Sequence, residues 1–109
     1  MSPRERRQRR EQRKPNHISV RYGHPAPAHQ AAAQRITRHG LFLSTNEVVY
    51  AEGSPISIEI AGPAEKWVVQ GIVRHAFKVH PEMARFTRPG MGIELTLVPD
   101  ACRDYLASL

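Results

Sequence analysis

The feature that most constrains this chain is a set of short segments in which apolar and polar residues alternate. The clearest covers residues 56–60, where three isoleucines alternate with a serine and a glutamate. A period of two residues is typical of a β-strand that buries one face and exposes the other. Glycine and proline at residues 53–55 and 62–63 bound this segment and predict a turn on either side. The pattern predicts a mainly β fold built from short strands.

Five further segments carry a similar signal. Strands are expected over residues 17–22, 31–36, 41–44, 67–77 and 91–98. In the last of them, Met91, Ile93, Leu95 and Leu97 are expected to point inward. Gly71, inside the long segment, predicts a bulge or a bend. Five or six short antiparallel strands are typical of a small closed or nearly closed barrel.

The C-terminal end predicts a short helix. Cys102, Tyr105, Leu106 and Leu109 recur at helical spacing and form one apolar stripe, with Asp100 as the expected N-cap. This stripe is expected to pack on the sheet or to close one mouth of the barrel. The expected fold class is therefore mainly β, a small six-stranded antiparallel barrel with one short C-terminal helix.

The basic character of the chain is concentrated at its N-terminal end. The 109 residues carry a formal net charge of +6, and residues 1–14 hold seven basic side chains against two acidic ones. We expect residues 1–14 to form a flexible basic arm and residues 15–109 to form the barrel domain. Such an arm suggests an anionic partner, such as a phosphate, a nucleic acid or an acidic lipid. A solubilising disordered end explains the charge equally well.

Several classes of protein are not expected from this composition. Cys102 is the only cysteine, which excludes an intrachain disulfide and fits a reducing compartment. No apolar run is long enough to span a membrane, and none follows the N-terminal charges as in a signal peptide. Nor do the histidine, cysteine and carboxylate residues form a pattern typical of catalysis or metal binding. We therefore expect a cytoplasmic protein that is not an enzyme and holds no metal or cofactor.

A short polar turn lies in the middle of the expected barrel, between two strand-like segments. Gly40 ends this turn. A glycine here indicates a backbone position that needs either a positive φ or the close approach of another group. Thr37, three residues earlier, can close the turn through its hydroxyl group. The run Leu41-Phe42-Leu43 leaves the turn as a strand, with both leucines on one face.

Two further motifs flank this turn along the chain. Upstream, Arg9 and Arg13 form an RxxxR pair, and Arg6 and Arg10 form a second pair in an overlapping register. Downstream, residues 90–92 read Gly-Met-Gly at the start of the last expected strand. In their order and separation the three elements resemble the PilZ family, small β-barrel receptors for the bacterial second messenger cyclic di-GMP. The resemblance covers roughly residues 9–97, most of the chain.

The resemblance implies a role for the arginines of the arm. In PilZ proteins the RxxxR arm closes over the ligand, which assigns that role to Arg9 and Arg13, with Arg10 as the candidate from the other register. An arginine fork binds phosphate through two hydrogen bonds, stacks on purine rings and matches the O6/N7 edge of guanine. Cyclic di-GMP offers all of these contacts in one compact anion.

The central turn departs from the family pattern D/N-x-S-x-x-G. With Gly40 aligned, Thr37 occupies the serine position and Arg35 the Asp/Asn position. Arginine has donors only and cannot accept a hydrogen bond from a guanine edge. The loss of a charged hydrogen bond costs about 1.5–3 kcal/mol. Against this, Arg35 and Arg38 add positive charge that can bind phosphate in a different pose, and His39 is a further candidate contact.

These observations lead to three alternative functions. The first is a non-enzymatic signalling module that binds cyclic di-GMP, at standard or weakened affinity, and relays this to a protein partner. The second is a degenerate PilZ-like domain that binds no nucleotide and acts as a protein–protein interaction adaptor, which Arg35 supports. The third is a small basic barrel that binds nucleic acid. It requires exposed aromatic platforms, and the aromatic residues fall mostly at expected core positions. They are Tyr22, Phe42, Tyr50, Trp67, Phe77, Phe86 and Tyr105.

Overall fold

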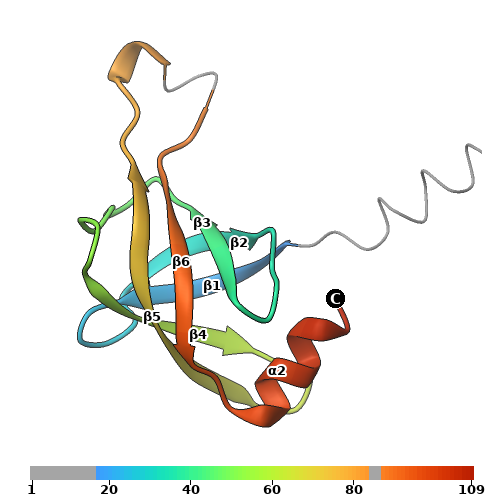
Figure 1. The fold of residues 1–109 in the computed structure, drawn as a ribbon. Coiled ribbons are helices and arrows are strands. Elements are labelled where there is room, and N and C mark those ends of the chain that lie inside the picture. Colours follow the sequence, from blue (N-terminus) through green and yellow to red (C-terminus); the bar gives the residue numbers. More distant parts are fainter. Residues whose placement is uncertain (1–16, 84–86) are drawn as a thin grey trace, which may run out of the picture.

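The computed structural model describes residues 17–83 and 87–109 and forms a closed antiparallel barrel of six strands (Figure 1). The strands are β1 (His17–Gly23), β2 (His29–Gln34), β3 (Gly40–Ser44), β4 (Pro55–Ala61), β5 (Lys66–Phe77) and β6 (Gly90–Leu97). A 3-10 turn, η1 (Pro81–Met83), lies between β5 and β6, and helix α2 (Asp100–Ala107) follows β6. The expected arm, with Arg9, Arg10 and Arg13, lies outside the described residues.

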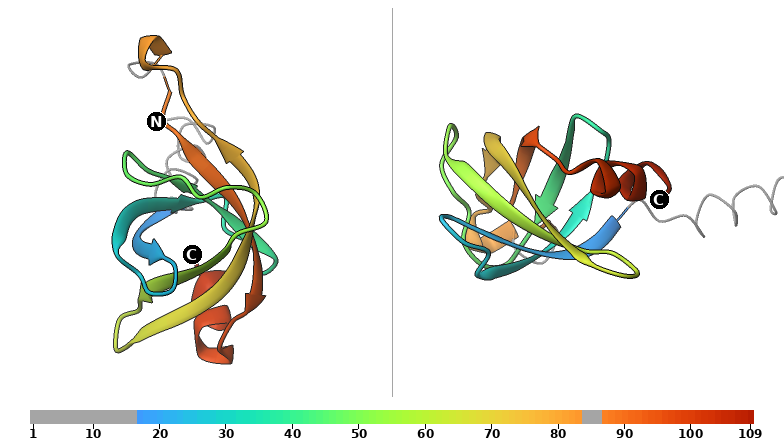
Figure 2. Two further views of the ribbon diagram at one scale, coloured as in Figure 1. Left: turned by 90° about the vertical axis from the view of Figure 1, so that its left-hand side faces the viewer. Right: turned by 90° about the horizontal axis from the view of Figure 1, so that it is seen from below.

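The strands follow one another around the barrel in the order β1-β2-β3-β6-β5-β4. Every neighbouring pair is antiparallel, and the pairing of β1 with β4 closes the barrel. Figures 1 and 2 show that the hairpin between β5 and β6 extends well beyond the rest of the barrel. The expected mainly β, six-stranded barrel with a short C-terminal helix is therefore confirmed.

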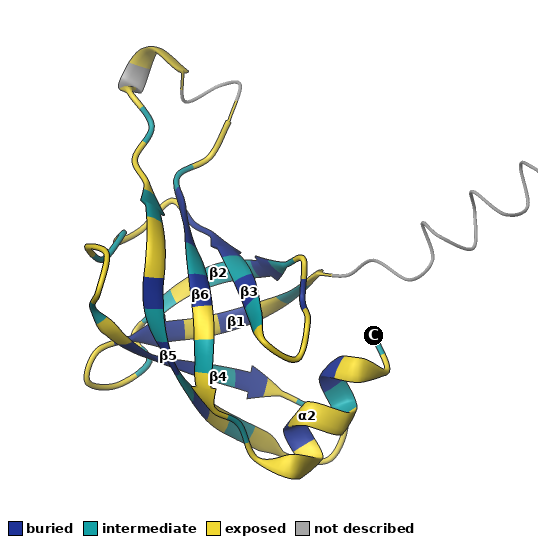
Figure 3. Cartoon of the chain, in the orientation of Figure 1, coloured by how far each residue is buried: buried dark blue, intermediate teal, exposed yellow. Residues whose placement is uncertain are grey.

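The inward-facing residues of the alternating segments fill the barrel. Ile56, Ile58 and Ile60 are fully buried, as are Leu43 and Val73. Figure 3 shows the buried and exposed bands that result along the strands. Because burying one such side chain stabilises a fold by about 1.5–3 kcal/mol, the pattern that predicts the strands also accounts for much of the barrel's stability.

A register shift in the pairing of β5 with β6 changes the direction of one expected core residue. Gln70 pairs with Leu97 and Gly71 pairs with Leu95, which leaves Thr96 as an extra residue on β6. The bulge expected at Gly71 is therefore confirmed. The shift also turns Leu97 to the outside of the barrel, where it is 66% exposed. The expected inward position of Leu97 is wrong for this reason.

A second shift lies nearer the end of β5. Val73 pairs with Ile93 and His75 with Gly92, which leaves Arg74 as an extra residue on β5. One extra residue reverses the alternation of side chains along a strand. Phe77 therefore points outward and is 52% exposed, so it is an exception to the core positions expected for most of the aromatic residues.

Most strand boundaries lie within two residues of expectation, and the differences at the end of β2 and the start of α2 have a clear cause. β2 ends at Gln34 instead of at residue 36, because Arg35 adopts a φ of 50°, which lies outside the strand region. Pro99 occupies the N-cap position of α2 and makes no side-chain cap, so the expected Asp100 N-cap is wrong. The Asp100 carboxylate lies instead in the first helical turn, where the helix dipole favours a negative charge.

Helix α2 packs its apolar stripe against the barrel. Cys102 and Leu106 are buried in the same cluster as the strand residues. The Trp67 ring packs on Tyr105 at a centroid distance of 5.5 Å, as expected for a tryptophan at the barrel rim. In the described part of the chain, no helix is long and apolar enough to cross a membrane.

Candidate functional site

The turn between β2 and β3 is closed by Thr37, as its position before Gly40 predicts. The Thr37 backbone N–H donates to the Gly40 carbonyl oxygen (2.9 Å), and the Thr37 hydroxyl donates to the same oxygen (3.2 Å). The hydroxyl oxygen in turn accepts from the backbone N–H groups of His39 (3.2 Å) and Gly40 (3.1 Å). These contacts fix the backbone of the turn while Thr37, Arg38 and His39 remain exposed.

Gly40 is required by the close approach of β6. It pairs with Glu94, and a Cβ at this position would lie 2.4 Å from the Ile93 carbonyl oxygen. Real Cβ atoms do not approach a backbone oxygen this closely, so a side chain would force β3 and β6 apart. Of the two reasons that the sequence offers for this glycine, close approach is the one found.

The positive φ in this connection falls on Arg35, at 50°. A residue with a Cβ loses roughly 1–2 kcal/mol of stability when its backbone adopts the left-handed region. Asparagine and aspartate adopt this region several-fold more often than other residues with a Cβ. Arg35 therefore occupies a backbone position that suits a short polar side chain better than an arginine.

The turn borders a depression of about 380 Å³ on the outer face of the barrel, which we call the turn-side depression. Its lining includes Arg35, Thr37, His39, Gly40, Arg74 and Glu94. The structure thus brings together four of the five site residues expected in the turn. The fifth, Arg38, is absent from the lining, and its Nε lies 3.4 Å from Nε2 of the His39 ring.

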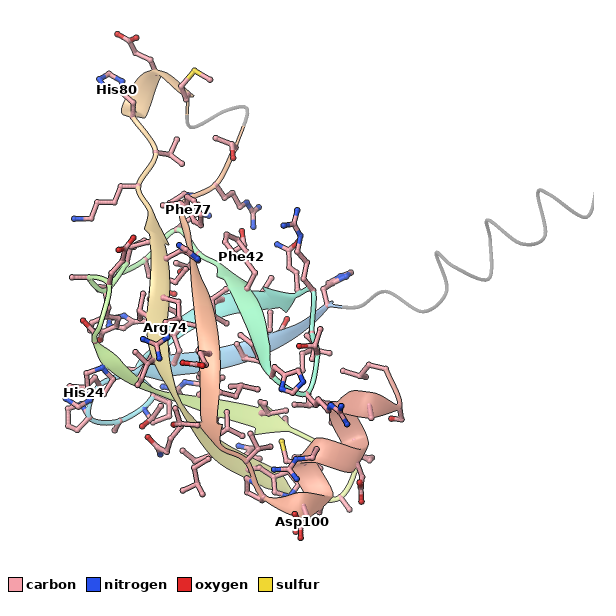
Figure 4. All side chains as sticks on the ribbon, viewed as in Figure 1. His24, Phe42, Arg74, Phe77, His80 and Asp100 are labelled. Atoms are coloured by element: carbon pink, nitrogen blue, oxygen red, sulfur yellow. The ribbon has the colours of Figure 1, made fainter. Side chains whose placement is uncertain are left out.

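Glu94 is the acidic residue of this depression, and sequence analysis did not select it as a site residue. It lies opposite Gly40 on β6, and its Oε2 accepts a hydrogen bond from Arg74 Nε at 2.6 Å and a second one from Arg74 Nη2. Among the described residues, no hydrogen bond to Oε1 is found. A carboxylate is an acceptor with room for about four bonds. The depression therefore contains the acceptor that Arg35 cannot supply, on a different strand. Figure 4 shows Arg74 on the outer face of the barrel.

A second depression of about 920 Å³, which we call the hairpin groove, continues from the first toward the hairpin of β5 and β6. Its lining includes Arg35, Phe42, His75, Phe77, Lys78, Arg88 and Gly92. Four of these, Arg35, Phe42, His75 and Gly92, line both depressions. None of the described residues that line the hairpin groove is acidic.

The hairpin groove presents two aromatic rings on the outer surface, whereas the other described aromatic residues lie in the core or pack against it, as expected for most of them. Phe42 lies between the inward Leu41 and Leu43, and its ring centroid is 5.8 Å from that of Phe77. The His75 ring is 6.2 Å from Phe77. Phe42 could have been assigned to the outer face from its leucine neighbours. Phe77 could not, because the bulge at Arg74 decides its direction.

Two groups with shifted pKa values lie in the barrel interior. Burial raises the pKa of Tyr22, whose hydroxyl donates to the Thr45 hydroxyl (3.0 Å) and contacts the Val48 carbonyl oxygen. Burial also raises the pKa of the Cys102 thiol. Burial disfavours the charged form of both groups, and both side chains belong to the packing of the barrel.

Comparisons of the chain with protein-family models, with curated proteins and with solved structures gave no match. The candidate site combines a rigid turn, one carboxylate opposite Gly40, aromatic rings on the outer face, and a surplus of arginine, lysine and histidine side chains.

Proposed function

We propose that this protein is a non-enzymatic, PilZ-like signalling module that binds cyclic di-GMP at the turn-side depression and relays this state to a protein partner. The observation that carries the proposal is Glu94. Its carboxylate lies opposite Gly40 in the depression, where it can accept hydrogen bonds from the N–H groups of a guanine edge. Glu94 thereby compensates for the arginine at the Asp/Asn position of the turn.

The entry point of the arm supports the same proposal. His17, the first residue of β1, pairs with Gln34, the residue before Arg35. The chain that precedes β1 therefore starts beside the turn-side depression. Arg13 is four residues before His17, a span of at most about 14 Å in an extended chain. An arginine at this position can reach a phosphate of a ligand bound at the turn.

The proposed mechanism divides recognition between the barrel and the arm. Glu94 and the rigid turn recognise a guanine, and Arg35 contributes a positive charge at the rim of the depression. Arg9 and Arg13 close over the phosphates from the other side through charge-assisted hydrogen bonds. Closing the arm changes the surface next to β1 and β2, and this change is the signal that a partner protein reads.

Calorimetric titration of cyclic di-GMP into the intact protein at physiological salt tests this function. Saturable binding is expected, with a loss of about 10–100-fold in affinity for Glu94→Gln, as for a lost charged hydrogen bond. The Arg9→Ala/Arg13→Ala double variant is expected to lose binding, whereas Arg6→Ala/Arg10→Ala tests the other register. Glu59→Gln, on β4 and outside the turn-side depression, is the control for removing a carboxylate.

The second candidate is an adaptor that binds no nucleotide, and the observation that favours it is Arg35 at the position of the family's acceptor. The same titration separates the two functions. Absence of heat with the wild-type chain, together with an intact melting transition, contradicts the receptor and favours the adaptor. Wild-type affinity in Glu94→Gln contradicts the role given to Glu94.

A further inference from the structure

Gly92 lies in the interior of β6 without a structural requirement for glycine. A Cβ built on Gly92 would meet its nearest neighbour, the His75 ring, at 3.5 Å, which is ordinary contact. By contrast, a Cβ on Gly40, Gly71 or Gly90 would approach backbone oxygens at 2.4–2.8 Å. Glycine weakens a strand interior, and one without a packing reason often marks the close approach of a ligand.

The residues on either side of Gly92 form the floor and walls of the hairpin groove. Phe42 on β3 and His75 on β5 are its direct cross-strand partners. Phe77, one alternation further along β5, contacts both of these rings and is half exposed. A flat floor of bare backbone between exposed rings fits a planar aromatic group, because such a group stacks on rings and lies close to a glycine.

The charges around the groove select an anion. Arg35 follows β2 and Arg88 precedes β6, so they lie at the two strands that flank β3 and Phe42. Lys78 and His80 line the groove on the hairpin. Because no acidic residue is found among the described lining residues, the groove attracts an anion with nothing in its wall to repel it. Figure 4 shows Phe42 and Phe77 side by side at the base of the hairpin.

We propose that the hairpin groove is a nucleotide subsite, in which a purine ring lies over Gly92 against Phe42 and Phe77 and a phosphate lies between Arg35 and Arg88. The assignment of this purine as the second guanine of cyclic di-GMP rests on the proposed function. The groove itself does not, since Phe77 and Arg88 do not line the turn-side depression and Glu94 does not line the hairpin groove.

The test combines the melting temperature with the affinity for cyclic di-GMP in three variants. Gly92→Val is expected to keep or raise the melting temperature, because a β-branched residue replaces a strand glycine, and to weaken binding at least tenfold by filling the floor. Phe77→Ala and Arg88→Gln are each expected to weaken binding about tenfold with little change in melting temperature. Thr96→Val, on the same strand, and Arg103→Gln, on α2, are controls outside both depressions.

The outcomes separate this inference from the proposed function. Wild-type affinity for cyclic di-GMP in Gly92→Val and Phe77→Ala, together with a loss of affinity in Glu94→Gln, overturns the subsite and leaves the proposed receptor function.

If cyclic di-GMP does not bind the wild-type chain, the fluorescent nucleotide mant-GTP is the probe. Binding of mant-GTP that Gly92→Val abolishes supports the subsite alone, and absence of binding overturns it. The subsite is also overturned if a single-stranded oligonucleotide displaces mant-GTP and the binding of that oligonucleotide depends steeply on salt concentration. This result favours a nucleic-acid surface.

Discussion

Arg35 combines an unfavourable backbone conformation with a side chain whose proposed role depends only on its charge. Its φ of 50° falls in the left-handed region, and its backbone ends β2 and begins the turn. A long charged side chain gains nothing from this conformation. Strain of this kind persists where the surrounding structure imposes it, here through the closure of the turn by Thr37 and Gly40.

The first prediction concerns this strain. Arg35→Asn is expected to raise the free energy of unfolding by about 1 kcal/mol, because asparagine is the more tolerant residue in the left-handed region. Urea denaturation of both proteins measures the difference. Arg38→Asn is the matched control, since it removes the same charge from an exposed position of the same turn without a positive φ. An equal change in both variants means that charge, and not backbone strain, is responsible.

At the scale of elements, the contact between β3 and β6 decides where the site forms. Gly40 and Glu94 are far apart in the sequence and become direct partners only through this pairing. The same pairing sets Phe42 opposite Gly92. The turn, the carboxylate and the floor of the hairpin groove are therefore all positioned by one strand pair.

The second prediction tests that strand pair with two glycines. Gly40→Ala is expected to lower the free energy of unfolding by about 1–3 kcal/mol, as overpacking does, because its Cβ meets the Ile93 carbonyl oxygen at 2.4 Å. Gly92→Ala, with its nearest neighbour at 3.5 Å, is expected to be neutral or stabilising. Thermal and urea unfolding of the two variants provide the comparison. Equal destabilisation by both alanines contradicts the distinction between a structural and a free glycine.

The strands and the turn could be predicted from the sequence because both depend on local patterns. Alternation predicts the isoleucine strand of residues 56–60, and the spacing of Thr37 and Gly40 predicts a turn closed by a hydroxyl group. Glu94 could not be predicted as a site residue, since its position depends on a non-local pairing. The outward direction of Phe77 could not be predicted either, because a strict period of two contains no sign of the bulge at Arg74.

At the scale of the whole molecule, the charge distribution and the topology act on the same region. Most of the net charge of +6 belongs to residues 1–14. His17, the first residue that the structure describes, pairs with Gln34, the residue before Arg35. The basic hairpin groove opens on the same outer face, across β3. A compact anion at this face is therefore within reach of positive charges from the turn and the hairpin.

The third prediction separates the stability of the barrel from the proposed affinity for cyclic di-GMP. Removal of residues 1–14 is expected to leave the melting temperature nearly unchanged, because the six strands and the buried core that the structure describes form a closed barrel within residues 17–109. The affinity for cyclic di-GMP is expected to fall by at least 100-fold, since the loss of two charged phosphate contacts costs about 1.5–3 kcal/mol each.

The control for charge alone is a variant that keeps the seven basic residues of the arm but scrambles their order, so that the RxxxR spacing is lost. If that scrambled arm restores full affinity, the arm acts by general attraction, and the specific pairing of Arg9 and Arg13 with the ligand is wrong. If the scrambled arm restores only part of the affinity, and that part is lost at high salt, the RxxxR spacing accounts for the rest of the affinity. The reason is that salt screening weakens diffuse attraction more than bidentate contacts.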